Sequence, residues 1–131
     1  MATVLIVDDS PTLMDAHKRM LENHHHTVIT ASDGEEGINI ALAQNPDLIL
    51  MDVVMPRMNG FQATRKLSRD PQTRHIPIIM VTSKDQETDI LWGKRQGAKD
   101  YLIKPIAEPT LISTVQRLLS EIALDRAALP V

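Results

Sequence analysis

Acidic, hydroxyl and basic side chains recur directly after short apolar runs in this chain. Asp8 and Asp9 follow the first such run, Asp52 follows the third, and Thr82 and Lys104 follow the fourth and fifth. Three carboxylates held close together repel one another and raise each other's pKa values unless a cation joins them. Hard oxygen ligands with room for water suit Mg²⁺ better than a soft metal. The set predicts a magnesium site, with a further positive charge from Lys104 and a hydroxyl donor from Thr82.

The apolar runs alternate with longer segments of helical periodicity. Strands are expected at Thr3–Val7, Thr27–Ala31, Asp47–Met51, Ile76–Val81 and Tyr101–Ile103, and helices at Pro11–Asn23, Gly34–Gln44, Gly60–Arg69, Gln86–Gln96 and Glu108–Leu124. Several strands are apolar at consecutive positions, which is expected of central strands covered on both faces. Five strand–helix units predict an α/β fold, a five-stranded parallel sheet with right-handed crossovers.

The strand order decides whether the acidic residues meet. In the flavodoxin-like, doubly wound order 2-1-3-4-5, the first and third strands are neighbours at the point where the order reverses, and ligands bind there. Asp8, Asp9 and Asp52 would then share one crevice. A single Asp at a strand end is usually a helix cap or a turn residue. Acids after two strands, a hydroxyl after the fourth and a lysine after the fifth rarely coincide by accident.

Composition sets the limits on function. The chain has 131 residues, enough for one domain, with 43% hydrophobic and 24% charged residues. It has no cysteine, which excludes disulfides and thiolate metal sites. A net charge of −3 argues against nucleic-acid binding. No segment predicts a signal peptide or a membrane span, so the protein is expected in the cytoplasm without membrane insertion.

Four motifs in register carry a family resemblance. They are Leu5–Ser10, Leu50–Pro56 with Asn59–Gly60, Val81–Lys84 and Asp100–Pro105. Together they resemble the receiver domain of two-component response regulators, the CheY-like family, from about Thr3 to Leu119. The segments Asn59–Arg65, Asp85–Asp89 and Trp92–Ala98 are most similar to single-domain regulators of type IV pili and twitching motility.

The resemblance implies a role for each site residue. Asp52 would accept a phosphoryl group from a phosphohistidine, and Mg²⁺, for which Mn²⁺ or Ca²⁺ could substitute, would assist. The metal would be held by Asp9, Asp52 and the backbone carbonyl of Val54, with a water anchored by Asp8. Lys104 and Thr82 would contact the phosphoryl oxygens. Thr82 and Tyr101 would form the switch, and the Lys104–Pro105 peptide would be cis.

The same resemblance implies partners and organisation. A sensor histidine kinase of the CheA type, or its phosphotransfer domain, would supply the phosphoryl group. Output would pass to a protein partner through the surface of the fourth helix, fifth strand and fifth helix. Residues 1–124 would form the receiver and residues 125–131 a tail with no output domain. The protein is expected to be a monomer and a signalling domain, not an enzyme, although it would assist its own phosphorylation and dephosphorylation.

Other functions remain open from the sequence. The protein could drain phosphate from a sister regulator. The complete set of acids, hydroxyl and lysine argues against a degenerate receiver that only binds partners. An aspartyl-phosphate phosphatase or phosphotransferase of the haloacid dehalogenase type needs a second acid two residues after the nucleophile, where this chain has Val54. In a flavodoxin-like carrier, Asp8 and Asp9 would repel the cofactor phosphate. His24–His26 is expected to be a solvated surface loop, and Trp92 either a partner anchor or packing filler.

Overall fold

Strands and helices alternate along the whole described part of the chain, residues 1–128 of this computed structural model. In order they are β1 (Thr3–Val7), α1 (Pro11–Glu22), β2 (Thr27–Ala31), α2 (Gly34–Gln44), β3 (Leu48–Met51), α3 (Gly60–Arg69), β4 (Ile78–Thr82), α4 (Glu87–Gln96), β5 (Asp100–Ile103) and α5 (Glu108–Ala128). The strands form one parallel sheet in the order β2-β1-β3-β4-β5. The predicted flavodoxin-like arrangement is confirmed.

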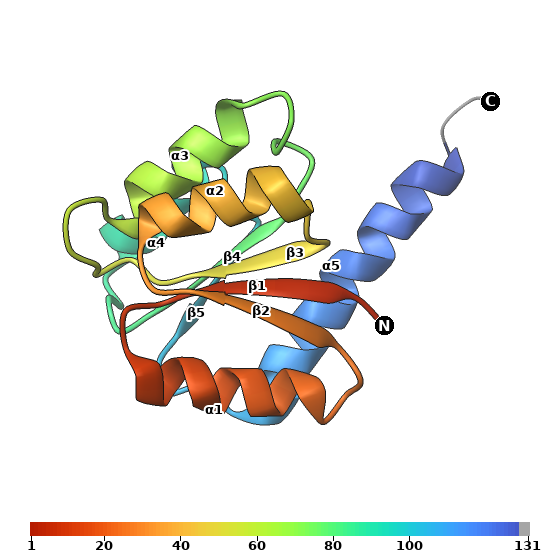
Figure 1. Ribbon diagram of the computed structural model, residues 1–131, viewed down its shortest axis with the longest axis horizontal. Coiled ribbons are helices and arrows are strands. Elements are labelled where there is room, and N and C mark those ends of the chain that lie inside the picture. Colours follow the sequence, from red (N-terminus) through yellow and green to blue (C-terminus); the bar gives the residue numbers. More distant parts are fainter. Residues whose placement is uncertain (129–131) are drawn as a thin grey trace.

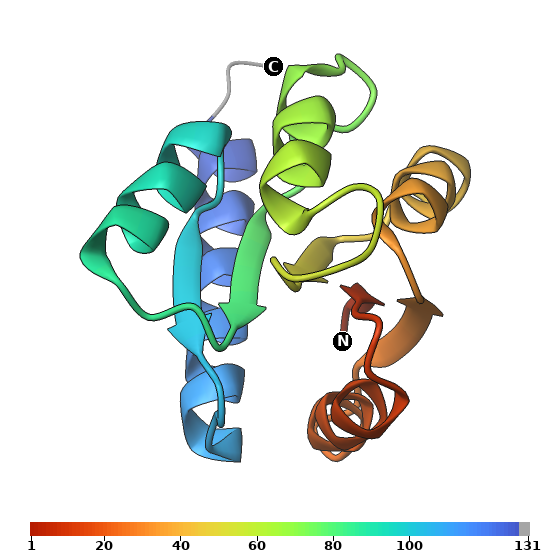
Figure 2. The same ribbon diagram turned by 90° about the vertical axis from the view of Figure 1, so that its left-hand side faces the viewer.

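Helices cover both faces of the sheet, with α2, α3 and α4 on one face and α1 and α5 on the other (Figures 1 and 2). Consecutive residues of β1 therefore enter different cores. Leu5 and Val7 pack with the first group of helices, and Val4 and Ile6 with the second. This double coverage is the reason that the central strands are apolar at consecutive positions.

Side-chain caps fix the helix starts that lie next to the sheet edge. Ser10 accepts a hydrogen bond from the Leu13 amide at the start of α1, and Pro11 occupies the first helical position. Asp33 caps α2 in the same way. Asn59 and Gln62 form a reciprocal capping box at the start of α3. Each cap ends a loop that leaves the carboxyl end of a strand.

Strand β4 and helix α5 differ from the predicted bounds by two or more residues, and α1, β3, α4 and β5 differ by one residue at one end. Strand β4 begins at Ile78, not at Ile76, because Pro77 has no amide hydrogen for the ladder, although its carbonyl accepts from Ile49. Helix α5 continues through Ala128, past Leu124, so the first four residues of the predicted tail are helical. The rest of that tail, 129–131, lies outside the described residues.

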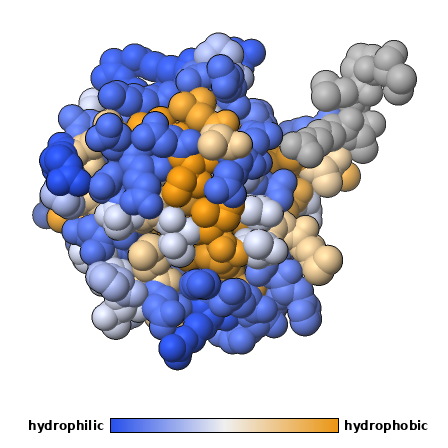
Figure 3. Space-filling model, in the orientation of Figure 1, coloured by the Kyte–Doolittle hydropathy of each residue, from blue (hydrophilic) through white to orange (hydrophobic). Residues whose placement is uncertain are grey.

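The face of the molecule seen in Figure 3 is mostly polar but carries an apolar strip. Figure 3 shows hydrophobic residues gathered across the middle of the face that carries α2 and β2. On these elements Leu42 is 39% exposed, and Ile29 is half-buried. Of the helices in the described residues, none combines the length and apolarity that crossing a bilayer requires.

Candidate functional site

The carboxyl ends of the strands bring the predicted acids together. Asp8 directly follows β1, and Asp52 directly follows β3. The Asp52 amide donates to the Val7 carbonyl at 2.9 Å. One carboxylate oxygen from each of Asp8, Asp9 and Asp52 lies within 4.8 Å of the other two. Asp8 and Asp52 are buried, whereas Asp9 is exposed. Among the described residues this is the one group of three or more acidic or histidine side chains placed to share a metal ion.

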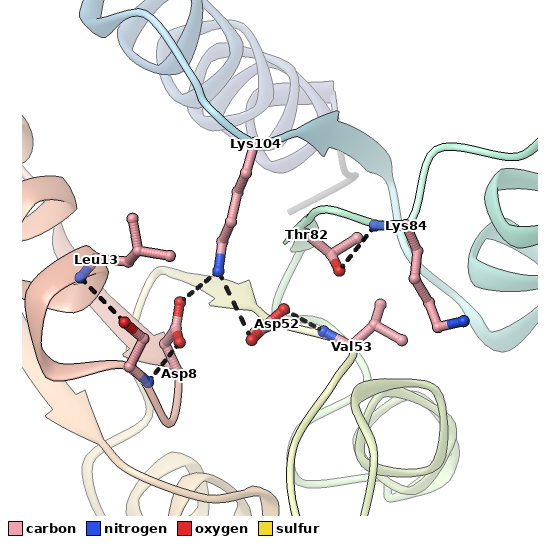
Figure 4. Close-up of polar contacts among 8 residues, drawn as sticks. Asp8, Leu13, Asp52, Val53, Thr82, Lys84 and Lys104 are labelled. Atoms are coloured by element: carbon pink, nitrogen blue, oxygen red, sulfur yellow. Dashed lines mark hydrogen bonds and ion pairs between the residues drawn. The ribbon is translucent and has the colours of Figure 1, made fainter.

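Lys104 reaches from the end of β5 into the acidic cluster (Figure 4). Its ammonium donates to Asp8 Oδ2 at 2.8 Å and lies 3.6 Å from Asp52 Oδ2. The lysine side chain is only 10% exposed, so water screens these interactions weakly. Asp8 Oδ1 also accepts from the Ser10 amide, and Asp52 Oδ1 from the Val53 amide. The two buried carboxylates therefore share one cation.

One lysine does not offset the electrostatic cost of the cluster. Burial raises the pKa of Asp52, Lys104 opposes that rise, and the neighbouring Asp8 adds to it. The Val53 amide and the Thr82 hydroxyl lower the same pKa by smaller amounts. Asp52 is therefore harder to ionise in the folded protein than in the unfolded chain, and a further cation at the site would relieve this.

The raised pKa of Asp52 gives a pH-dependent stability effect in metal-free protein. A carboxyl whose pKa is higher in the folded state contributes stability below its ordinary pKa, and the contribution is lost as pH rises through the folded value. We expect Asp52→Asn to be more stable than the wild type at pH 7.5 in EDTA, with a smaller difference at pH 4.5. Urea unfolding followed by circular dichroism measures both. A gain that is equal at both pH values would contradict the assigned cause.

The donor set fits Mg²⁺. All three acids offer hard carboxylate oxygens, and the buried pair lies beside an exposed Asp9 that leaves the cluster open to solvent on one side. Mg²⁺ uses one or two carboxylates and retains several waters, which matches an open cluster of this kind. Asp9, Asp52 and Asp8 are thus suited to hold the ion directly or through water.

Magnesium should accordingly stabilise the folded chain. Since the unfolded chain lacks the cluster, Mg²⁺ at ten times its Kd should add about 1.4 kcal/mol. That corresponds to a rise in Tm of about 4 °C. Differential scanning calorimetry with MgCl₂, against NaCl of equal ionic strength, measures it. Asp9→Asn removes one of the carboxylates and should lose most of the rise in Tm. Because Asp9 is exposed, this change should leave the fold intact. An unchanged rise would exclude Asp9 from the metal site.

Thr82 and Tyr101 both contact the loop between β4 and α4. Thr82 ends β4, is fully buried, and accepts from the Lys84 amide at 3.4 Å. The Tyr101 hydroxyl donates to the Lys84 carbonyl at 2.8 Å, with the ring buried beside Gly93. Burial, together with nearby acids, raises the pKa of Tyr101 to about 12. A movement of this loop would therefore change both side chains.

Two predicted features remain, the Lys104–Pro105 peptide bond and the carbonyl of Val54. The Lys104–Pro105 peptide bond is cis. Val54 stands two residues beyond Asp52 with its side chain 56% exposed. Its carbonyl as a metal ligand stays a prediction.

Gly60 is a site residue that the sequence interpretation did not single out. A Cβ at this position would lie 1.9 Å from the Asp52 carbonyl oxygen and 2.9 Å from the Val53 Cα. The Gly60 amide also donates to the Val53 carbonyl at 2.9 Å. The start of α3 is thus pressed against the backbone that presents Asp52. The sequence shows a glycine after Asn59, a residue type that commonly caps helices. It does not indicate which segment of the chain lies against that glycine.

Arg57 links the loop after Asp52 to the start of α2. Its guanidinium donates to Asp33 Oδ2 at 3.0 Å, while Asp33 also caps α2. Arg57 has a φ of 66°, a left-handed conformation that few non-glycine residues adopt. Nothing in the sequence indicates this contact.

The histidine run is only partly the solvated loop that was predicted. His24 is exposed and contacts Glu108 at 3.2 Å, but His26 is buried, and its Nδ1 accepts from the Ala2 amide. The expectation that all three face solvent is wrong for His26, because the turn after α1 folds it under the N-terminal residues. Trp92 is 49% exposed on α4, so it does not fill the core.

Comparison with known proteins assigns the chain to a family. Residues 4–116 match the response regulator receiver domain family, and the chain belongs to that family. PilH of Pseudomonas aeruginosa is 56% identical to it over 120 residues, which cover 92% of this chain and 99% of PilH. Response regulator PleD of Caulobacter vibrioides is 41% identical over 121 residues, covering 89% of this chain but only 26% of PleD.

Solved structures show the same architecture. The chemotaxis protein CheY4 of Vibrio cholerae superimposes with a TM-score of 0.84 at 36% identity, covering 89% of this chain and 98% of CheY4. A CheY-like receiver domain protein from Methanospirillum hungatei gives a TM-score of 0.89 at 26% identity, covering 95% and 98% of the two chains. The CheY-like fold is therefore shared over nearly the whole chain.

Proposed function

We propose that this protein is a phosphorylation-dependent switch that accepts a phosphoryl group from a histidine kinase on Asp52 with the help of Mg²⁺. The observation that carries the proposal is the cluster of Asp8, Asp9 and Asp52 at the carboxyl edge of the sheet, with the Lys104 ammonium beside Asp8 and Asp52. A charged acceptor beside a metal-binding set is what phosphoryl transfer requires, because the protein supplies mainly position and charge.

Asp52 acts as the nucleophile. One carboxylate oxygen attacks the phosphorus atom of a phosphohistidine, the bond from phosphorus to the imidazole nitrogen breaks, and the nitrogen keeps the electron pair. Mg²⁺, when bound, offsets the negative charge that gathers on the acids and the phosphoryl oxygens. Lys104 lies 3.6 Å from Asp52 Oδ2 and contacts one oxygen of the new group. The buried Thr82 hydroxyl donates to another.

The new charge then biases the loop after β4. Thr82 moves toward the phosphoryl group, and the Lys84 segment that it contacts moves with it. The Tyr101 hydroxyl is hydrogen-bonded to the Lys84 carbonyl in the same segment, so the tyrosine ring changes position as well. The result is a shift in population between two packings of α4, β5 and α5. Leu91, Trp92 and Ile103 on this surface are 36–53% exposed and offer apolar anchors to a protein partner.

The cellular role is drawn from the PilH relative. Identity of 56% over nearly the full length of both chains supports a single-domain regulator of type IV pili and twitching motility, or of a chemotaxis-like pathway. The kinase would be CheA-like, or its phosphotransfer domain, and the protein would act in the cytoplasm.

Phosphotransfer profiling tests the proposal. Histidine kinases of the source cell are autophosphorylated with labelled ATP and mixed with the wild type or with Asp52→Asn. We expect one CheA-like kinase to transfer to the wild type much faster than the others and none to transfer to the variant. Absence of transfer from every kinase, in protein that binds Mg²⁺, would contradict the proposed input.

Lys104→Ala should separate phosphorylation from output. The acceptor and the metal-binding acids remain, so we expect acetyl phosphate still to label the variant. Without the ammonium, the phosphoryl group loses a contact that biases the switch, and twitching in a complemented deletion strain should match that of the Asp52→Asn strain. Full output from Lys104→Ala would remove the lysine from the switch.

A further inference from the structure

Positive charge is concentrated on one segment of this acidic protein. Residues 57–75, which contain α3 and its flanking loops, carry five arginine or lysine residues and a single acid, Asp70. Their net charge is +4 in a chain whose total is −3, so the rest of the chain carries −7. The overall acidity of the protein therefore conceals a basic face.

Four of these cations line a groove along α3. The groove has a volume of about 790 Å³. Arg57 stands at one end, and Arg65, Lys66 and Arg69 lie along the helix; all four are exposed. Met58, Gln62, Asp70 and Pro71 complete the lining. In Figure 3 the surface over α3, at the top of the molecule, is largely hydrophilic.

Three of the cations have no carboxylate partner. Among the side chains that the structure describes, Arg65, Lys66 and Arg69 form no ion pair, and only Arg57 is paired, with Asp33. Arg65 and Arg69 are four residues apart on one helix, a spacing at which like charges destabilise the helix. Lys66 and Arg69 lie in the last turn and benefit from the helix dipole, but Arg65 does not share this position. An anionic partner would remove the repulsion.

We propose that the α3 groove binds an acidic segment of a partner protein, at a surface separate from α4, β5 and α5. A concave site with cationic walls and the apolar side chains of Met58 and Pro71 fits a peptide that combines glutamate or aspartate with an apolar residue. Single-stranded nucleic acid is disfavoured because the lining has no aromatic side chain on which bases could stack. An anionic membrane is disfavoured because the remaining charge of −7 would be repelled by it.

Fluorescence anisotropy with a synthetic acidic peptide tests this. The probe is fluorescein-labelled and consists of repeated Glu-Glu-Leu, and the control probe replaces each glutamate with glutamine. We expect saturable binding of the acidic probe only, weakened by added NaCl. Arg65→Glu with Arg69→Glu should weaken it at least about tenfold. Arg95→Glu with Lys99→Glu, two exposed cations at the same spacing, makes an equal change in net charge and should weaken it less than about twofold.

Asp52 labelling by acetyl phosphate shows whether each variant retains its fold and its acceptor site. If the Arg65 and Arg69 reversal impairs labelling, Arg65→Gln with Arg69→Gln replaces it and should still weaken the peptide several-fold. Equal weakening by both pairs, no binding of the acidic probe, or tighter binding to a single-stranded RNA or to phosphatidylglycerol vesicles would overturn the proposal. So would self-association of the wild type in sedimentation experiments that the reversal abolishes, since the groove would then hold a second copy of this chain.

Discussion

Asp52→Asn is expected to abolish labelling of the protein by acetyl phosphate in the presence of Mg²⁺. The amide that replaces the carboxylate is a poor nucleophile, and the neighbouring Asp8 is already hydrogen-bonded to Lys104. The wild type should gain one phosphoryl group, detectable by intact mass, and lose it on treatment with hydroxylamine, which cleaves acyl phosphates. Because the same change removes a carboxylate whose pKa is raised by burial, we expect the variant to remain folded, and circular dichroism checks this.

Asp85→Asn is the matched control for this experiment. Asp85 is an exposed acid in the loop after β4, at the same edge of the sheet, but outside the acidic cluster. Acetyl phosphate should label the Asp85→Asn variant to the same extent as the wild type. Labelling of Asp52→Asn at the wild-type level, or a label that survives hydroxylamine, would exclude Asp52 as the acceptor.

Gly60→Ala is expected to destabilise the protein by about 3 kcal/mol or more, among the larger effects of a single added methyl group. The new Cβ would meet the Asp52 carbonyl oxygen at 1.9 Å, and backbone atoms cannot move aside as a flexible side chain can. The better helix propensity of alanine, worth up to about 1 kcal/mol, is too small to compensate. Urea unfolding should show a lower midpoint with an unchanged slope.

Gly34→Ala is the control because Gly34 is also the first residue of a helix after a capping side chain. Its Cβ would meet the side chain and carbonyl of Met58 at 3.3 Å, a tight but relievable contact. We expect a change of less than about 1 kcal/mol. If both variants lost the same stability, the close approach of α3 to Asp52 would not be the cause.

The fold could be predicted because the sequence indicates which strands are buried on both faces and where the following helices begin. Apolar residues at consecutive positions of β1 report two covered faces, and Ser10–Pro11 marks the start of α1. The strand order then brings Asp8 and Asp52 together without any knowledge of side-chain positions. Predictions about bounds were weaker where one residue changes the hydrogen bonding, as Pro77 does before β4.

Contacts between distant residues were beyond prediction. Nothing in a run of three histidines says that the third lies beneath Ala2, since this depends on where the turn after α1 ends. Likewise Arg57 and Asp33 are 24 residues apart and meet because two loops leave the same sheet edge. Such contacts follow from the exact geometry of loops, for which residue type alone carries little information.

In the unphosphorylated protein the Lys104 ammonium is already paired with Asp8. A phosphoryl group added at Asp52 must compete with Asp8 for a single ammonium, and only the difference between the two attractions can drive the switch. The sensitivity of the response is therefore a property of residue 8 as much as of the acceptor. Evolution could adjust how strongly such a regulator responds by altering the residues around Asp8 that set its attraction for Lys104.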